Sequence, residues 1–158
     1  MEPISTELRQ LVKDFSTKFN SISEKEFAAK PLPGKWSKKE VLGHLIDSAQ
    51  NNLRRFICGQ YETTPSKIIY DQNFWVNANN YQNVPTQEII LLWRLVNERI
   101  ADVILSMPQE NRMKLCDTGK HEVQLYSIEW LAEDYVKHMK HHLNQIIAGS
   151  FDVVYISK

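Results

Sequence analysis

Apolar side chains recur at every third or fourth position along four segments of the chain, and this spacing is typical of amphipathic helices. The four segments are residues 4–22, 37–58, 86–107 and 127–147. In the first of them the repeating positions are Ile4, Leu8, Leu11, Phe15, Phe19 and Ile22. Because each helix would have one apolar stripe to bury, we predict that the four pack together as a four-helix bundle.

The start of the second helix is marked by residues that satisfy free backbone groups. Ser37 and Glu40 have the spacing of a capping box, in which each side chain accepts a hydrogen bond from the other residue's backbone N–H. Trp36 precedes this cap and is placed to pack against Val41. We expect Gly59 to terminate the helix, because glycine adopts the backbone conformation that commonly follows a last helical turn.

The connections between the predicted helices are long. Residues 60–85 lack a sustained apolar period and are expected to form a loop with a short helical turn around residues 73–76. Residues 109–126 form a second loop, and loops of this length often serve as lids or pocket walls. The β-branched tail, residues 151–156, is expected to be a short strand or an extended arm packed on the bundle. The chain is thus predicted to be a single all-α domain, residues 1–158, with long connecting loops.

Composition restricts the class of protein. The 158 residues are 42% hydrophobic and 24% charged, which is the balance of a globular domain with its own core. Nineteen basic and nineteen acidic residues leave no net charge to attract a nucleic-acid backbone or an anionic membrane surface. We predict no membrane-spanning helix and no signal peptide. Cys58 and Cys116 have no metal-type spacing and no disulfide framework, so we expect inert thiols and a cytoplasmic setting.

Three of the five histidines lie in the fourth predicted helix. His138 and His142 are one turn apart on one helix face, a spacing that suits a single metal ion. The apolar stripe contains His142 and borders His138, whereas His141 falls outside it. His121 is expected to be an exposed loop residue, because Leu125 interrupts the zinc-protease pattern His-Glu-x-x-His. The histidine pair either binds a metal or is part of the core, and a third ligand would favour the metal.

His44, in the second predicted helix, is the candidate third ligand, because metal sites in bundles draw ligands from facing helices. It lies on the polar face of its helix with Asp47 and Arg55, and such a face is equally consistent with a solvated surface. Ser48 and Asn51 are uncharged and would suit a water-accessible pocket at one end of the bundle. From the residues alone, both interpretations stay open.

Further residues are candidates for the pocket around such a metal. Asp47 could orient His44 or act as a base, or it could be a solvated carboxylate. Arg55 could bind a substrate carboxylate or be a surface charge. Trp75 and Tyr81 of the long loop could close the pocket, although packing accounts equally well for at least one of them.

Two stretches of the chain, KWSKKEVLGHLID at residues 35–47 and DYVKHMKHHLNQI at residues 134–146, resemble the DinB/YfiT-like superfamily. The resemblance covers essentially the whole chain. It implies a four-helix bundle with a divalent metal, typically nickel or zinc, held by three histidines. Matched to this sequence, these are His44, His138 and His142.

The superfamily that the chain resembles includes S-transferases that use bacillithiol, mycothiol or glutathione, an isomerase, and members without known activity. Three neutral imidazoles leave the charge of an ion uncompensated and a coordination position open, where water or a thiol can be activated. We therefore consider three functions: an S-transferase that activates a bacillithiol-like thiol toward a small electrophile, a hydrolase that uses metal-bound water, and a non-catalytic metal-binding bundle. The first is preferred.

A homodimer is also predicted, because the third helix carries more apolar surface than one core needs. Trp93 and Ile100 lie on one face of this helix, and Leu91, Leu95 and Val96 are spread around it.

Overall fold

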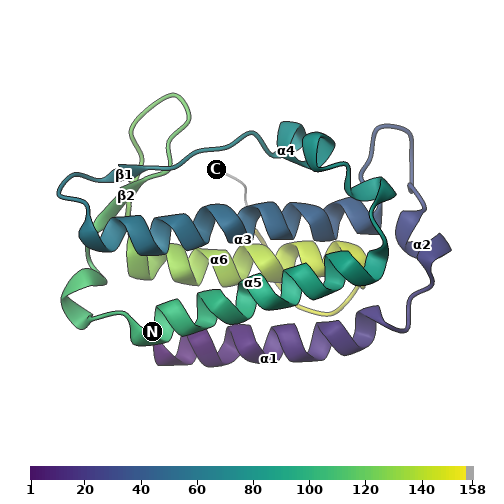
Figure 1. Ribbon diagram of the computed structural model, residues 1–158, viewed down its shortest axis with the longest axis horizontal. Helices are drawn as coiled ribbons and strands as arrows, with labels where there is room; N and C mark the ends of the chain where they lie inside the picture. Colours follow the sequence, from purple (N-terminus) through teal and green to yellow (C-terminus); the bar gives the residue numbers. More distant parts are fainter. Residues whose placement is uncertain (156–158) are drawn as a thin grey trace.

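Four long helices lie side by side in the computed structural model, which describes residues 1–155 (Figure 1). They are α1 (Glu2–Phe19), α3 (Lys38–Tyr61), α5 (Thr86–Ser106) and α6 (Ile128–Ile146). Two short helices, α2 (Glu24–Ala28) and α4 (Gln72–Asn79), and two 3-10 turns, η1 (Tyr81–Asn83) and η2 (Gln109–Asn111), lie in the connections. The predicted four-helix bundle is confirmed.

The helix directions explain the length of the connection between α3 and α5. In Figure 1, α1 and α6 run in one direction along the bundle, and α3 and α5 run in the opposite direction. Because α3 and α5 are parallel neighbours, residues 62–85 must return along the whole bundle before α5 can begin. This return places α4 and η1 against α3.

A small three-stranded sheet lies at one end of the bundle and was not predicted. Its strands are β1 (Ser66–Lys67), β2 (Leu115–Asp117) and β3 (Leu125–Ser127). The central strand, β2, pairs parallel with β1 and antiparallel with β3. Strands of two or three residues are too short for an alternating apolar pattern to be recognised in the sequence.

Two helix boundaries differ from the prediction. The segment predicted as one helix over residues 4–22 ends at Phe19, and Ser23 caps a separate helix, α2. Gly59 does not terminate α3, which continues to Tyr61. Glycine is needed at position 59 for close packing, because a Cβ there would lie 2.8 Å from the Cys116 sulfur.

The polar face of α3 is buried rather than solvated. His44, Asp47, Ser48 and Asn51 are at most 2% exposed, because α3 contacts α4 and η1 as well as α5 and α6. This excludes the interpretation of the face as a solvent-exposed surface. Within the described residues 1–155, no helix combines the length and the apolar character needed to cross a membrane.

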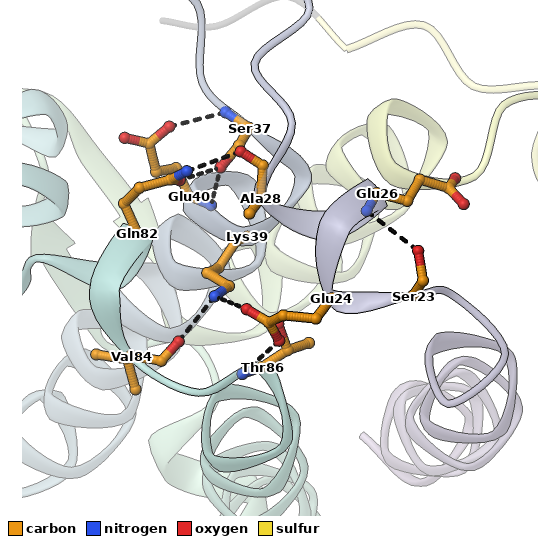
Figure 2. Close-up of polar contacts among 10 residues, drawn as sticks. All are labelled: Ser23, Glu24, Glu26, Ala28, Ser37, Lys39, Glu40, Gln82, Val84 and Thr86. Carbon is orange, nitrogen blue, oxygen red and sulfur yellow. Dashed lines mark hydrogen bonds and ion pairs between the residues drawn. The ribbon is translucent and has the colours of Figure 1, made fainter.

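A polar network joins the start of α3 to the elements around it (Figure 2). The capping box is confirmed: the Ser37 hydroxyl accepts a hydrogen bond from the Glu40 N–H, and the Glu40 carboxylate accepts one from the Ser37 N–H at 2.8 Å. Lys39 is 3% exposed; it pairs with Glu24 of α2 and donates to the Val84 carbonyl oxygen. These contacts hold the start of α3 against α2 and the segment that leads into α5.

Candidate metal centre

Three imidazoles converge where α3 faces α6. His44 comes from α3, and His138 and His142 come from successive turns of α6. One ring nitrogen of each lies within 4.8 Å of one ring nitrogen of the other two. The Nε2 atoms of His44 and His138 are 3.3 Å apart, and the His44 and His142 ring centroids are 4.6 Å apart. The structure therefore brings together the three residues that the sequence singled out as ligands.

Burial keeps these imidazoles neutral at pH 7. Loss of solvation, with a smaller effect of the nearby His142, lowers the pKa of His44 to about 3. Loss of solvation also lowers the pKa of His142 to about 4 and that of His138 well below its usual value. A neutral imidazole has a free lone pair, so the three rings can bind a cation without first losing protons.

The nitrogen atoms fit a divalent ion by their chemistry as well as by their spacing. Nitrogen ligands are suited to zinc and nickel, and three of them leave at least one coordination position open. His44 Nδ1 is buried and has no hydrogen-bond partner among residues 1–155. An ion held by His44 Nε2, which faces His138 Nε2, would leave Nδ1 without a partner, so the burial of this atom is a cost to the fold with or without a metal.

The two α6 imidazoles are oriented by hydrogen bonds at their Nδ1 atoms, on the side of each ring away from the triad. His142 Nδ1 lies 3.0 Å from Gln145 Oε1, and His138 Nδ1 lies 3.4 Å from the Ser48 hydroxyl. Such contacts fix the tautomer and direction of a metal-binding imidazole. No role was predicted for Gln145, although its position three residues after His142 on the same helix could have indicated this contact.

His44 Nδ1 makes no hydrogen bond within residues 1–155, and packing holds this side of the site in place. The Trp36 ring lies against the His44 ring, with the two centroids 5.1 Å apart. On the neighbouring residue, Gly43, a Cβ would be 2.1 Å from the Tyr81 ring, so η1 docks directly on the α3 backbone. Tyr81 is therefore buried against α3 at the residue next to His44 and does not close the site from the outside, as was considered from the sequence.

Asp47 holds the return segment against α3. Its Oδ1 atom accepts hydrogen bonds from the Tyr81 hydroxyl at 2.7 Å and from Asn79 Nδ2 at 2.9 Å. Its Oδ2 atom is buried and has no partner within residues 1–155, and burial raises the pKa of Asp47 to about 6. Asp47 thus makes no hydrogen bond to His44; it positions the elements that pack around that histidine.

A polar cavity of about 340 Å³ adjoins the histidines, and we call it the first cavity. His138, His141 and His142 lie in its wall, together with residues of α3, the sheet and the C-terminal arm. Its wall includes Ser48, Asn52, Arg55, Tyr70, Lys120, Asp134 and Tyr155. The C-terminal arm, residues 151–155, forms neither a helix nor a strand. The last residue of the predicted tail, 156, lies outside the described residues.

Arg55 brings a half-buried positive charge to this cavity. Its guanidinium donates hydrogen bonds to the Ile68 carbonyl oxygen at 2.6 Å and to Asn52 Oδ1 at 3.2 Å. No carboxylate among residues 1–155 lies within ion-pair distance of it, and burial lowers its pKa. Its charge is therefore available to an anionic group that enters the cavity.

Neither Trp75 nor His141 belongs to the histidine triad. Trp75 does not line the first cavity, but Tyr70 does. The Trp75 ring packs edge-on against the Tyr70 ring, with 5.6 Å between the centroids. His141 is outside the triad, and its ring lies 5.0 Å from that of His142 and 5.7 Å from that of Tyr155. Tyr155, which donates a hydrogen bond to Asp134, thus places the C-terminal arm beside the site.

The fold and site define a helical bundle with a candidate three-histidine metal centre beside a polar cavity. The sequence model of the DinB superfamily matches residues 7–146. The chain therefore belongs to the DinB superfamily.

Curated relatives are similar over most of the chain. A protein of Geobacillus thermodenitrificans, provisionally named a metal-dependent hydrolase, is 27% identical over 117 residues, 73% of this chain and 64% of that protein. The chain thus spans less than two thirds of the length of this relative. A protein of Oceanobacillus iheyensis with the same kind of provisional name is 22% identical over 129 residues, 77% of this chain and 72% of that protein.

Solved structures share the fold. YfiT from Bacillus subtilis, described as "a probable metal-dependent hydrolase with an unusual four-helix bundle topology", has a TM-score of 0.80 at 19% identity and covers 91% of this chain and 82% of its own. The mycothiol-dependent maleylpyruvate isomerase has a TM-score of 0.72 at 12% identity, with 97% of this chain and 64% of that chain covered. At these identities the likeness establishes the fold alone.

Proposed function

We propose that His44, His138 and His142 hold a divalent ion, nickel or zinc, and that the chain is a metal-dependent enzyme acting on a small molecule. The observation that carries this proposal is the convergence of three neutral imidazoles beside a polar cavity. The ion, when bound, would supply a positive charge that favours deprotonation of a water or thiol at its open position.

We infer that the nucleophile is a low-molecular-weight thiol and the reaction an S-transfer. Arg55 supports this, because its unpaired guanidinium in the first cavity suits a carboxylate of a peptide-like or glycoside-like thiol. The name of the mycothiol-dependent isomerase also favours a thiol. Trp75 would contribute only through Tyr70, as a support for this wall.

Hydrolysis is the second candidate function, and a different observation favours it. Both curated relatives are provisionally named metal-dependent hydrolases, and YfiT is described as a probable one. In this case water would take the place of the thiol, and Arg55 would bind a carboxylate of the compound to be cleaved. Asp47 stays a predicted base, although its hydrogen bonds to Tyr81 and Asn79 favour a positioning role.

Metal content tests the proposed ligand set. The protein is purified without a histidine tag, and its nickel and zinc are measured together with those of His44→Ala, His138→Ala, His142→Ala and the neighbouring control His141→Ala. We expect about one ion per chain in the wild type and in His141→Ala, and loss of the ion in the other three. Wild-type protein that binds neither metal would contradict the proposal.

Two assays separate the candidate reactions. The metal-loaded protein is incubated with an aryl chloride in the presence of glutathione, bacillithiol or mycothiol, and separately with a nitrophenyl ester and no thiol. Thiol conjugation that is lost in His44→Ala, with a raised KM for the thiol in Arg55→Gln, would support S-transfer. Ester cleavage without thiol would support hydrolysis, and a metal-loaded protein inactive in both would point to a non-catalytic bundle.

A further inference from the structure

The C-terminal arm, residues 151–155, borders two cavities. Its far end, Tyr155, is part of the wall of the first cavity, beside His138 and His141. Its near end borders another cavity, of about 460 Å³, which lies between α1, α6 and the arm and which we call the second cavity. Only the far end of the arm therefore reaches the metal centre.

The arm runs back along α6 with little slack. Phe151 is hydrogen-bonded to Asn144, near the end of α6, and Tyr155 is hydrogen-bonded to Asp134, ten residues earlier on the same helix. Ten residues of α-helix rise about 15 Å. The four steps of chain from Phe151 to Tyr155 cover about 13–14 Å when fully extended. Because the arm is nearly stretched between these two contacts, release of one end is enough to move it.

The two ends of the arm are held unequally. At the near end, the Asn144 side chain donates a hydrogen bond to the Phe151 carbonyl oxygen and accepts one from the Phe151 N–H, both at 2.8 Å. The Phe151 ring also stacks on Phe15, with 5.5 Å between the centroids. At the far end, the Tyr155 hydroxyl donates one hydrogen bond, to Asp134 Oδ2, at 3.1 Å. The near end is therefore the fixed one.

The middle of the arm has few packing contacts. Val154 is 76% exposed, and Asp152 is exposed as well. Val153 is half-buried and borders the second cavity. A segment with so little buried apolar surface can move at a low cost in free energy.

The volume of the first cavity gives a reason for the arm to move. At about 340 Å³ the first cavity is near the lower end of the range that holds one small molecule, about 300–1,000 Å³. The proposed S-transfer brings two molecules, a thiol and an electrophile, together beside the ion. With Tyr155 in the wall beside His138, at 5.2 Å between the ring centroids, this space is restricted next to the proposed ligands.

We propose that the C-terminal arm is a gate of the first cavity, with Phe151 as its hinge and the Tyr155–Asp134 hydrogen bond as its latch. When the latch opens, Tyr155 moves away from His138 and His141, and the first cavity widens to admit both reactants. This inference rests on the proposed S-transfer, because that reaction needs room for two molecules. Such movements of loops and arms occur on the microsecond-to-millisecond timescale.

Methyl NMR of the metal-free protein tests the gate without catalysis. Relaxation dispersion of the Val153 methyl groups measures exchange between a closed and an open arm. Tyr155→Phe keeps the ring and removes the latch, so we expect it to raise the open population about fivefold, the factor for one hydrogen bond. Tyr126→Phe removes a hydroxyl elsewhere in the wall of the first cavity and should leave the population unchanged. Equal open populations in Tyr155→Phe and the wild type, or no exchange in either, would overturn the proposal.

Removal of zinc tests whether the gate controls access to the ion. The chelator 4-(2-pyridylazo)resorcinol takes zinc from the loaded protein, and the second-order rate constant measures how easily it reaches the ion. We expect Tyr155→Phe to raise this rate constant and that of zinc uptake by the same factor, about fivefold. The zinc affinity should then change by less than about twofold, because a gate affects entry and exit alike. A lower affinity with an unchanged uptake rate would show that Tyr155 supports His138, and would overturn the proposal.

The two measurements also separate this inference from the proposed function. Protein that binds neither nickel nor zinc would remove the proposed function, whereas a Val153 exchange that responds to Tyr155→Phe would keep the arm as a gate of the first cavity. Thiol conjugation by a protein whose Val153 exchange and zinc removal are unaffected by Tyr155→Phe would keep the S-transfer and remove the gate.

Discussion

The three imidazoles of the centre have different supports. His138 and His142 each have a polar contact on the side away from the triad, with Ser48 and Gln145. His44 has none among residues 1–155 and is fixed by the surfaces around it. Its position therefore depends on residues that do not touch a metal, chiefly those that hold Tyr81 and Trp36 in place.

The Tyr81–Asp47 hydrogen bond should contribute a pH-dependent stability. Replacing Tyr81 by Phe removes a donor from a buried carboxylate, which we expect to raise the pKa of Asp47 further. The free energy of unfolding of Tyr81→Phe should fall by about 1–3 kcal/mol at pH 8, where Asp47 is charged, and by less at pH 5. Urea unfolding at the two pH values measures this.

Asp47→Asn provides the comparison for this experiment. In the Asp47→Asn background, Tyr81→Phe should lose its pH dependence, because the titrating group is gone. Tyr61→Phe serves as a control, since Tyr61 is an exposed tyrosine. If Tyr81→Phe lowers the free energy of unfolding equally at pH 5 and pH 8, Tyr81 stabilises the fold by packing alone.

At the scale of elements, glycines determine how closely other segments approach α3. Gly43 allows η1 to lie on the helix backbone near its start, and Gly59 allows β2 and α6 to approach near its end. Helix propensity alone disfavours both glycines by about 1 kcal/mol relative to alanine. Tertiary packing thus outweighs local preference at both positions.

Gly43→Ala should therefore destabilise the protein although alanine is the better helix former. The added Cβ would lie 2.1 Å from the Tyr81 ring, so the ring and η1 must move. We expect a net loss of about 1–3 kcal/mol and a weaker affinity for zinc, because the displacement occurs at the residue next to His44. Thermal unfolding and zinc titration against a competing chelator measure the two effects.

Gly59→Ala is the matched control for this substitution. Its Cβ would meet the ends of the Cys116 and Ile128 side chains at 2.8 and 2.9 Å, and the flexible Ile128 end can move. We expect a smaller loss of stability and an unchanged zinc affinity, because Gly59 lies near the end of α3 whereas His44 lies near its start. Equal zinc affinities of the Gly43→Ala variant and the wild type would contradict the role assigned to η1.

At the scale of the whole molecule, the buried histidines make folding sensitive to acid. The pKa of His44 is about 3 and that of His142 about 4 in the folded protein, below the usual value of 6.5, and that of His138 is also lowered. Between each folded-state pKa and 6.5, the unfolded chain binds more protons than the folded protein does. The free energy of unfolding therefore falls as the pH drops below about 6.5. The raised pKa of Asp47 has the opposite effect: between pH 3.8 and about 6, its protonation stabilises the folded protein as the pH falls. This single carboxyl group offsets only part of the effect of the three histidines.

We expect metal-free protein to lose stability on the order of 1 kcal/mol per pH unit for each of these histidines below pH 6.5. Urea unfolding at intervals from pH 7.5 to pH 4.5 measures the slope. Replacing His44 and His142 together by glutamine should make it shallower, whereas His121→Gln, at an exposed loop position, should not. A slope unchanged in the double variant would refute this account.

The homodimer stays a prediction, and fewer residues of α5 support it than the sequence suggested. Trp93 and Ile100 are fully buried in the core, so they cannot form a contact between subunits. The exposed apolar residues of α5 are Leu91, Leu92 and Leu95, which are 45–48% exposed, and Leu105. Sedimentation should show a dimer at micromolar concentration that Leu91→Glu together with Leu95→Glu dissociates. A wild-type monomer would contradict the prediction.

The sequence by itself determined the bundle and the choice of three histidines. Apolar residues at helical spacing identify each long helix, because burial of one stripe per helix is a local pattern. The capping box at Ser37 and Glu40 is similarly local and was read correctly. His138 and His142 were paired by their one-turn spacing, His44 was the candidate from a facing helix, and the family resemblance favoured all three as ligands.

Only the tertiary structure decided what surrounds those histidines. The burial of Asp47, the docking of Tyr81 on Gly43 and the position of Arg55 in a cavity all depend on where residues 62–85 return across α3. That path follows from the parallel directions of α3 and α5, which are set by contacts between residues distant in sequence. A polar helix face has the same pattern whether water or another segment covers it, so its environment could not be inferred from the chain alone.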